Sequence, residues 1–229
     1  DLLRMPHFEY NENIASFYDL PYSRLKVESE FISMESTKFN RHGIHTHPYL
    51  LANFSYPEET SPIHRGVFVS RKILGRSLRP PREAISFRTA DFDPSWNMRE
   101  KVTSITKPAN CMSCHDVINS TGFSLEGFDA TGRTRKELGG DPINLKVNFL
   151  DDKGVRSELN GPEDLLEQAL SSSKTAEAFV YELSKYVAKQ APESYSTLEI
   201  SRLSQRLYEN QITLMDLYYQ ICMMTACDG

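Results

Sequence analysis

The sequence predicts a mainly α-helical protein with one short β-hairpin and a helical C-terminal unit. Four segments of the last third repeat apolar residues about every 3.6 positions, which is the spacing of amphipathic helices. The stretch PINLKVNF (142–149) alternates well enough for a short strand, and VRSEL (155–159) is its expected hairpin partner. Helices should therefore dominate the fold.

The first half should contain helical and loop material, with helices at 12–20, 59–75 and 95–106. The second of these has the clearest signals: Ser61 can cap its start, Pro62 suits the first turn, and Gly75 marks its end. Residues 122–135 contain three glycines and are expected to form loop and turn.

The expected C-terminal helices cover 161–170, 174–190, 196–210 and 213–224. Asn160 is a suitable helix start, and Ser196 with Glu199 has the spacing of a capping box. We expect these helices to pack as a bundle-like unit.

Charge and hydropathy exclude two classes of partner. The formal net charge is −5, with acidic and basic residues interspersed, so no basic field is present to attract nucleic acid. No apolar run reaches about 18 residues, so we expect no membrane span.

The stretch NCMSCHDV (110–117) carries the main functional signal, because Cys111 and Cys114 are three positions apart and His115 follows directly. From the Cys and His frequencies of this chain, the expected number of chance occurrences of Cys-x-x-Cys-His over its length is roughly 0.002. Three chemistries use related patterns: a redox dithiol, a zinc site and covalent haem attachment.

The haem reading fits the pattern best. A thioredoxin-like dithiol needs a preceding strand, whereas the residues before the motif are predicted to be a helix and a proline turn. Zinc needs two further ligands at a partner spacing, and neither the Cys222–Cys227 pair nor the histidines of residues 42–47 provide them. On a helix, residues three apart are neighbours, so Cys111 and Cys114 could both bond one haem c, with His115 as proximal iron ligand.

The distal iron ligand is less determined. His47, in HTHPY, is the first choice, although it could equally be an ordinary histidine near a helix start. The alternatives are no protein ligand or one of five other residues, namely His45, His64, Met98, Met223 and Met224.

Other residues could hold the haem periphery. Arg65, Arg133 and Arg135 are candidates for pairing with propionates, because arginine binds carboxylates through two parallel hydrogen bonds. Phe123 and Phe128 could pack on the porphyrin edge. The structural alternatives are that Arg65 braces a helix start and that Arg133 pairs with Asp129 in a turn. The two phenylalanines could instead fill the core. Cys222 and Cys227 form either a disulfide or two thiols.

Nearly the whole chain resembles a family of secreted cytochrome-like proteins of unknown function that are abundant in planctomycetes and marine bacteria. The resemblance rests on TSPIHRG (60–66), Cys-x-x-Cys-His and GFSLEGFDATGR (122–133), with weaker similarity in the helical tail. It implies a c-type haem protein that works in the periplasm or is secreted, as the C-terminal part of a longer precursor. Members often have Met-Asp-Pro where this chain has Ile118, Asn119 and Ser120, so we expect none of these three to serve the iron.

We therefore expect three parts: the end of a preceding helical domain (1–40), a haem c-binding domain (41–150) and a C-terminal helical domain (151–229). The expected function is single-electron transfer by one haem to a redox partner protein, within a larger protein or complex. The alternative is a haem enzyme with an open distal site that acts on peroxide, oxygen or a small redox substrate.

Overall fold

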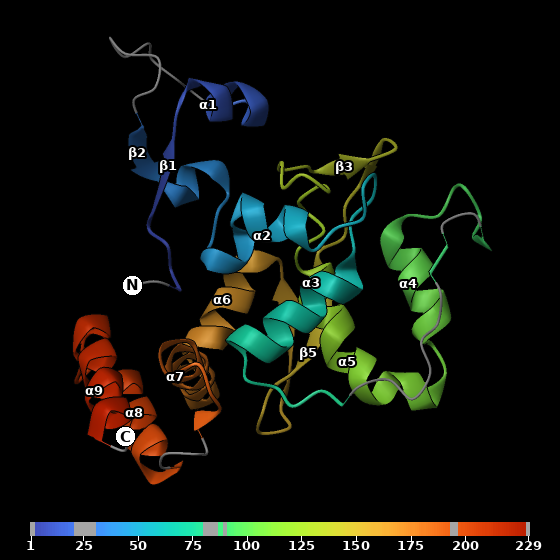
Figure 1. The fold of residues 1–229 in the computed structure, drawn as a ribbon. Coiled ribbons are helices and arrows are strands. Elements are labelled where there is room, and N and C mark those ends of the chain that lie inside the picture. The colour runs from blue at the N-terminus through green and yellow to red at the C-terminus, as the bar shows by residue number, and fades with distance from the viewer. Residues whose placement is uncertain (1–2, 21–30, 80–86, 89–90, 193–196, 228–229) are drawn as a thin grey trace.

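The computed structural model describes residues 3–20, 31–79, 87–88, 91–192 and 197–227, without the side chains of 226 and 227. A central group of helices lies between an N-terminal strand pair and three C-terminal helices (Figure 1). Helices make up 54% of the structure, and the strands form small antiparallel pairs. The architecture is mixed but mainly helical, as predicted in outline.

The N-terminal segment contains strands that the sequence analysis did not expect. Strand β1 (His7–Tyr10) pairs antiparallel with β2 (Ile32–Glu35), and helix α1 (Glu12–Tyr18) begins at Asn11, whose side chain accepts from the Ile14 amide. Alternate residues of β1 are buried, and they join a small core that is separate from the main one. Its buried members are Phe8, Tyr10, Ala15 and Phe39.

The predicted helix at 59–75 consists of two parts. Helix α3 (Pro62–Phe68) continues directly into a π-helical segment, η3 (Val69–Ile73). The Ser61 hydroxyl accepts from the His64 amide at 3.4 Å, and Gly75 has a φ of +64°, so both predicted ends are confirmed. Three short helices lie between β2 and α3, namely η1 (Ser36–Phe39), η2 (Ile44–Thr46) and α2 (Pro48–Asn53).

Helices α4 (Met98–Thr106) and α5 (Ala109–Phe123) are joined by only two residues, Lys107 and Pro108. Helix α4 begins three residues later than predicted because Asn97 forms a capping box with Glu100, each side chain bonding the other's backbone amide. The short connection keeps the two helices next to each other (Figure 1).

The predicted hairpin is confirmed, with a shifted first strand. Strand β5 (Lys146–Leu150) pairs with β6 (Arg156–Asn160), with Val147 opposite Leu159. The residues before it form a separate pair, β3 (Glu137–Leu138) with β4 (Asp141–Pro142). Helix α6 (Pro162–Leu170) starts after Gly161, whereas Asn160 ends β6 and is not the cap that we predicted.

Three further helices form the C-terminal unit: α7 (Ser173–Ala188), α8 (Thr197–Tyr208) and α9 (Leu214–Cys227). Their buried apolar residues form a second core, which includes Val180, Leu203 and Leu217. The predicted helices are confirmed. The predicted capping box depends on Ser196, which lies outside the described residues.

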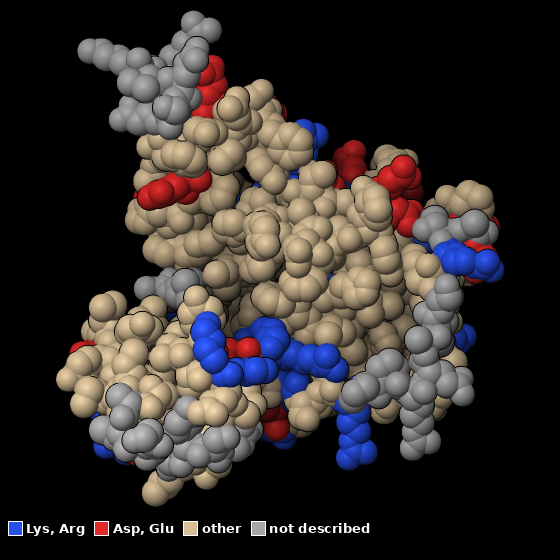
Figure 2. Space-filling view, viewed as in Figure 1, with Lys and Arg blue, Asp and Glu red and all other residues tan. Residues whose placement is uncertain are grey.

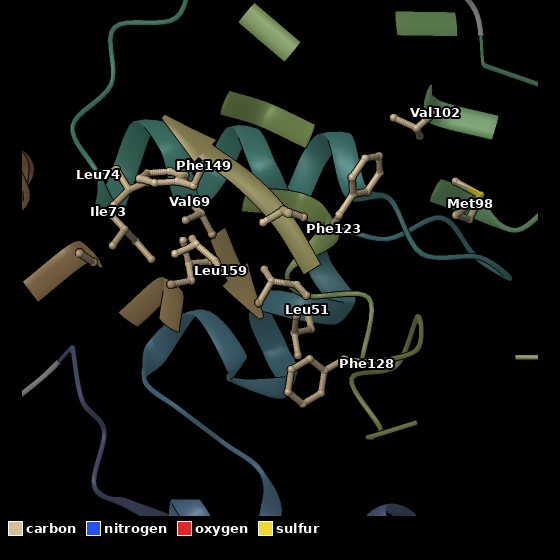
Figure 3. Packing of buried hydrophobic residues seen from close by; sticks show 14 residues of the cluster. Leu51, Val69, Ile73, Leu74, Met98, Val102, Phe123, Phe128, Phe149 and Leu159 are labelled. Carbon is tan, nitrogen blue, oxygen red and sulfur yellow. The ribbon is translucent and has the colours of Figure 1, made fainter. Parts of the chain in front are cut away.

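The main core joins the central helices to the β5–β6 hairpin. Phe149 and Leu159 of the hairpin lie beside Val69 and Ile73 of η3 (Figure 3). The same cluster contains Leu165 of α6. The hairpin and α6 therefore pack with residues before 150, although we had placed a domain boundary there.

Helices α3 and α5 cross at two glycines. A Cβ on Gly66 would lie 2.1 Å from the carbonyl oxygen of Ile118, and one on Gly122 would lie 2.1 Å from that of Pro62. Only residues without a side chain allow the two backbones to approach this closely. This crossing fixes α5, which carries the Cys-x-x-Cys-His motif, against the core.

Candidate haem site at the start of α5

The motif occupies the first two turns of α5. Pro108 precedes the helix, and its carbonyl oxygen accepts from the amides of Cys111 and Met112 at 2.9 and 3.0 Å. Cys111, Cys114 and His115 have i, i+3 and i+4 spacing, so they lie on adjoining parts of one helix surface. All three side chains are half-buried, and both thiols are free.

The imidazole of His115 is held by a chain of hydrogen bonds. Its Nδ1 lies 3.0 Å from Oδ1 of Asn119, and Nδ2 of Asn119 donates to Oγ1 of Thr106 at 2.8 Å. The Thr106 hydroxyl in turn donates to the carbonyl oxygen of Val102, also at 2.8 Å. Asn119 thus contacts the iron-ligand candidate through a hydrogen bond, while the expectation that residues 118–120 do not themselves serve the iron stays a prediction.

A hollow of about 520 Å³ lies beside His115, between α4, α5 and β5. Its volume is within the range of small-molecule and cofactor sites. It is lined by Arg99, Thr103, Thr106, Lys107, Met112, His115, Asp116, Asn119, Ser120, Phe123, Val147 and Asn148. Successive helical residues are about 100° apart, so the two cysteines lie on the far side of His115 from the centre of this hollow.

Arg99 provides a positive charge at the wall of the hollow. Its guanidinium donates to the carbonyl oxygens of Asn144 and Lys146, both at 2.7 Å, and lies 4.8 Å from the ring centroid of Phe123. Burial lowers the pKa of Arg99. Lys107 adds a second, exposed cation at the same hollow.

At the edge of the hollow, Asp116 is paired with Arg156 of β6 at 2.7 Å. The remaining charges are dispersed. In Figure 2, acidic and basic atoms occur in small groups on a largely uncharged surface, and one compact basic group lies low in the view with acidic atoms inside it. The visible face therefore carries no broad basic surface of the kind that binds nucleic acid.

Among the predicted peripheral residues, Phe123 lines the hollow and Arg65 does not. Arg65 is 1% exposed, and burial lowers its pKa to about 10. Its guanidinium donates to the Ser55 hydroxyl and to the carbonyl oxygens of Leu51, Leu125, Phe128 and Asp129. Its donors are thus directed at the protein itself.

Arg133, Arg135 and Phe128 also lie outside the lining of the hollow. Arg133 donates to the carbonyl oxygen of Phe17 and lies over that ring, whereas Arg135 pairs with the buried carboxylate of Glu126 at 3.1 Å. Phe128 is fully buried in the main core. Propionate binding by these residues stays a prediction.

The three candidate histidines lie elsewhere in the fold. His47 caps α2, where its Nδ1 accepts from the Tyr49 amide at 3.2 Å, and burial lowers its pKa. His45 is buried with Nε2 at 2.9 Å from the carbonyl oxygen of Pro162, and burial lowers its pKa to about 4. The ring of His64 is 3.0 Å from the Ser61 hydroxyl. None of the three lines the hollow.

The candidate methionines are also outside it. Met98 is buried in the main core, and Met224 packs on the C-terminal core beside the exposed Met223. Among the described residues that line the hollow, only Met112 and His115 carry a sulfur or an imidazole, and both belong to α5. No sulfur or imidazole faces His115 from the α4 or β5 wall of this hollow.

The structure also bears on the two rival chemistries. The element before the motif is helix α4, so the strand that precedes a thioredoxin-like dithiol is missing. Within the part of the chain that the structure describes, no group of three or more His, Cys, Asp or Glu side chains is arranged to hold a metal ion. Two thiols and one oriented imidazole on adjoining parts of α5 are the arrangement that covalent haem attachment requires, and the haem reading stays a prediction.

Near the C-terminus, the Cys222 thiol is free, and the side chain of Cys227 lies outside the described residues. Both residues belong to α9, in which residues five apart are separated by about 8 Å between Cα atoms. A disulfide needs a separation below about 7 Å, so this helix does not provide the backbone turn that a bridge requires.

Within the described ranges, no helix is long and apolar enough to cross a membrane.

Sequence reasoning named only His115 and Phe123 among the residues that line the hollow, and those it missed include Thr106, Asn119, Arg99 and Lys107. Asn119 follows His115 by four positions on a predicted helix, and this spacing alone could have identified it. The other three come from α4 and the connection after it. Their positions depend on how α4 packs against α5, for which the sequence has no local signal.

Comparison with known proteins agrees with the resemblance over part of the chain. Residues 41–138 match the family PSCyt3, described as a protein of unknown function (DUF1588), which is a planctomycete cytochrome-like domain family. The match covers less than half of the chain. No curated protein and no solved structure matches.

Proposed function

We propose that this chain is a monohaem c-type cytochrome that transfers single electrons outside the cytoplasm. Cys111 and Cys114 would each add their S–H bond across one haem vinyl group, which forms two thioethers and releases no leaving group. Nε2 of His115 would bind the iron, and the iron supplies the one-electron chemistry. The observation that carries the proposal is the half-buried Cys111–Cys114–His115 set on one surface of α5, of which His115 lines a hollow of cofactor size.

The residues around the hollow support this role. Apolar contact would come from Phe123 and Val147, while the positive charges of Arg99 and Lys107 suit the propionate carboxylates. The net charge of −5 would favour a redox partner protein with a basic docking face. A periplasmic or secreted location, and a place within a larger protein or complex, are parts of the same proposal.

The test is covalent haem retention by the full chain, produced in the periplasm of a bacterium that matures c-type cytochromes. Haem should stay on the polypeptide after denaturation and acid–acetone extraction. Cys111→Ser and Cys114→Ser should each leave a single thioether, which changes the reduced pyridine haemochrome spectrum. Cys222→Ser is the matched control and should leave it unchanged. A wild-type chain that loses all haem on extraction would overturn the proposal.

A second function is supported by the wall that faces His115. If no other part of the chain supplies a sixth ligand, the site could bind peroxide, oxygen or a small redox substrate as an enzyme. Cyanide should then perturb the ferric Soret band at low concentration. An unchanged band in excess cyanide would count against this alternative and favour simple electron transfer.

A further inference from the structure

We infer that Asn119 sets the tautomer of His115, with Thr106 fixing the orientation of the Asn119 amide, so that Nε2 is the free ring nitrogen. The significance of this free nitrogen rests on the proposed function, in which Nε2 binds the iron. The inference itself concerns only the side chains of this chain. It makes Asn119 a positioning residue that acts through His115.

The direction of the hydrogen bonds follows from Thr106. Its hydroxyl has one hydrogen, which is directed at the carbonyl oxygen of Val102 one turn earlier in α4. Towards Asn119, this hydroxyl can therefore only accept. The amide must present its NH₂ group to Thr106 and its carbonyl oxygen to His115.

The proton on His115 follows in turn. A carbonyl oxygen cannot donate, so the ring nitrogen that faces it, Nδ1, must carry the hydrogen. In the neutral ring, Nε2 then holds the lone pair. No hydrogen-bond partner for Nε2 is found among the described residues, which leaves it available to a ligand.

Burial makes the opposite arrangement unfavourable. Asn119 is 8% exposed and Thr106 is 3% exposed, so little water can replace a lost partner. A flipped amide would place its carbonyl oxygen at the Thr106 hydroxyl, whose hydrogen would then have to leave the Val102 carbonyl oxygen. Buried polar groups without partners are unfavourable, so this arrangement is disfavoured.

The three residues are also held together by the fold. Thr106 is the last residue of α4, and two residues separate that helix from α5. The chain of hydrogen bonds from Val102 through Thr106 and Asn119 therefore connects the α4 backbone to His115. A fixed Nδ1–H donor makes an imidazole a stronger ligand, which stabilises ferric iron over ferrous iron.

The first measurement is made on the haem-free full chain, produced in the cytoplasm, by ¹⁵N–¹H NMR of its histidine rings at alkaline pH. His115 should carry its proton on Nδ1. Asn119→Leu and Thr106→Val should shift it towards the Nε2–H form that imidazole favours in water, and Thr106→Ser should restore the wild-type tautomer. A wild-type ring protonated on Nε2 would overturn the inference whether or not haem binds.

The second measurement is the reduction potential of the haem-loaded chain. Asn119→Leu should shift it to a more positive value, because the ligand becomes weaker. Asn148→Leu is the matched control: the same substitution in the same hollow, at a residue of β5 instead of α5. An equal shift in both variants would refute a positioning role. Failure to retain haem would instead remove the proposed function and leave the tautomer result intact.

Discussion

Gly66 of α3 lies directly against α5, where a Cβ on it would come within 3.2 Å of the Gly122 amide nitrogen and 2.1 Å of the Ile118 carbonyl oxygen. Both neighbours are backbone atoms, which cannot move aside as a flexible side chain can. The contact lies about one turn beyond His115, so the position of the motif depends on it.

Gly66→Ala should consequently destabilise the protein, by about 1–3 kcal/mol or more, because the two helices must separate. Urea unfolding followed by circular dichroism measures the change. Gly127→Ala is the control: its new Cβ would meet the flexible Leu145 side chain at 3.3 Å and the Arg135 carbonyl oxygen at an ordinary contact distance of 3.9 Å. Equal stability of the two variants would show that the crossing is not tightly packed.

Arg65→Met should lower the free energy of unfolding by about 3–5 kcal/mol, since it leaves buried carbonyl oxygens without their donor and removes one of the two arginines beside the Glu126 carboxylate. Arg88→Met, at an exposed ion pair with Asp91, should change it by less than about 1 kcal/mol. If Arg65→Met kept wild-type stability and instead shifted the reduction potential of the haem-loaded chain, the propionate role predicted from the sequence would gain support.

His45 should make stability depend on pH. Burial lowers its pKa from 6.5 to about 4 in the folded state, so its contribution is complete above pH 6.5 and is lost as the pH falls towards 4. The total loss from this group should be up to about 3 kcal/mol. His45→Gln keeps a donor for the Pro162 carbonyl oxygen and should flatten the stability profile between pH 4 and 6.5. An unchanged slope in this variant would contradict the assignment.

Asn97→Ala should remove about 1 kcal/mol of stability, because the capping box at the start of α4 loses its acceptor. Asn97→Asp keeps that acceptor and should behave like the wild type in the same urea titration. Hydrogen exchange at the first amides of α4 should rise only in the alanine variant. Equal protection in both variants would mean that packing alone holds this end.

Local signals predicted much of the fold. Ser61, Pro62 and Gly75 defined a helical segment from residues close together in sequence, and periodicity located the C-terminal helices. The strands at 7–10 and 32–35 were missed because their pairing joins segments more than twenty residues apart. The start of α4 was misplaced because the cap at Asn97 was not recognised.

The residues of the candidate site also fall into those that local spacing predicts and those that only tertiary packing brings into place. The spacing of Cys111, Cys114 and His115, which lie within five positions of each other, is enough to predict covalent haem attachment. The acceptors around Arg65 come from residues 51–55 and 125–129, so its burial could not be anticipated from its neighbours in sequence. Arg99 reaches Phe123 only because α4 folds back along α5.

The placement of strand β5 has a consequence for how this molecule can be divided. The segment that matches the cytochrome-like family ends at residue 138, whereas Val147 and Asn148 form one wall of the hollow and Phe149 fills the core beneath η3. A fragment limited to 41–138 would retain the motif and lack that wall. The smallest autonomous folding unit that contains the motif should therefore extend through α6, to residue 170.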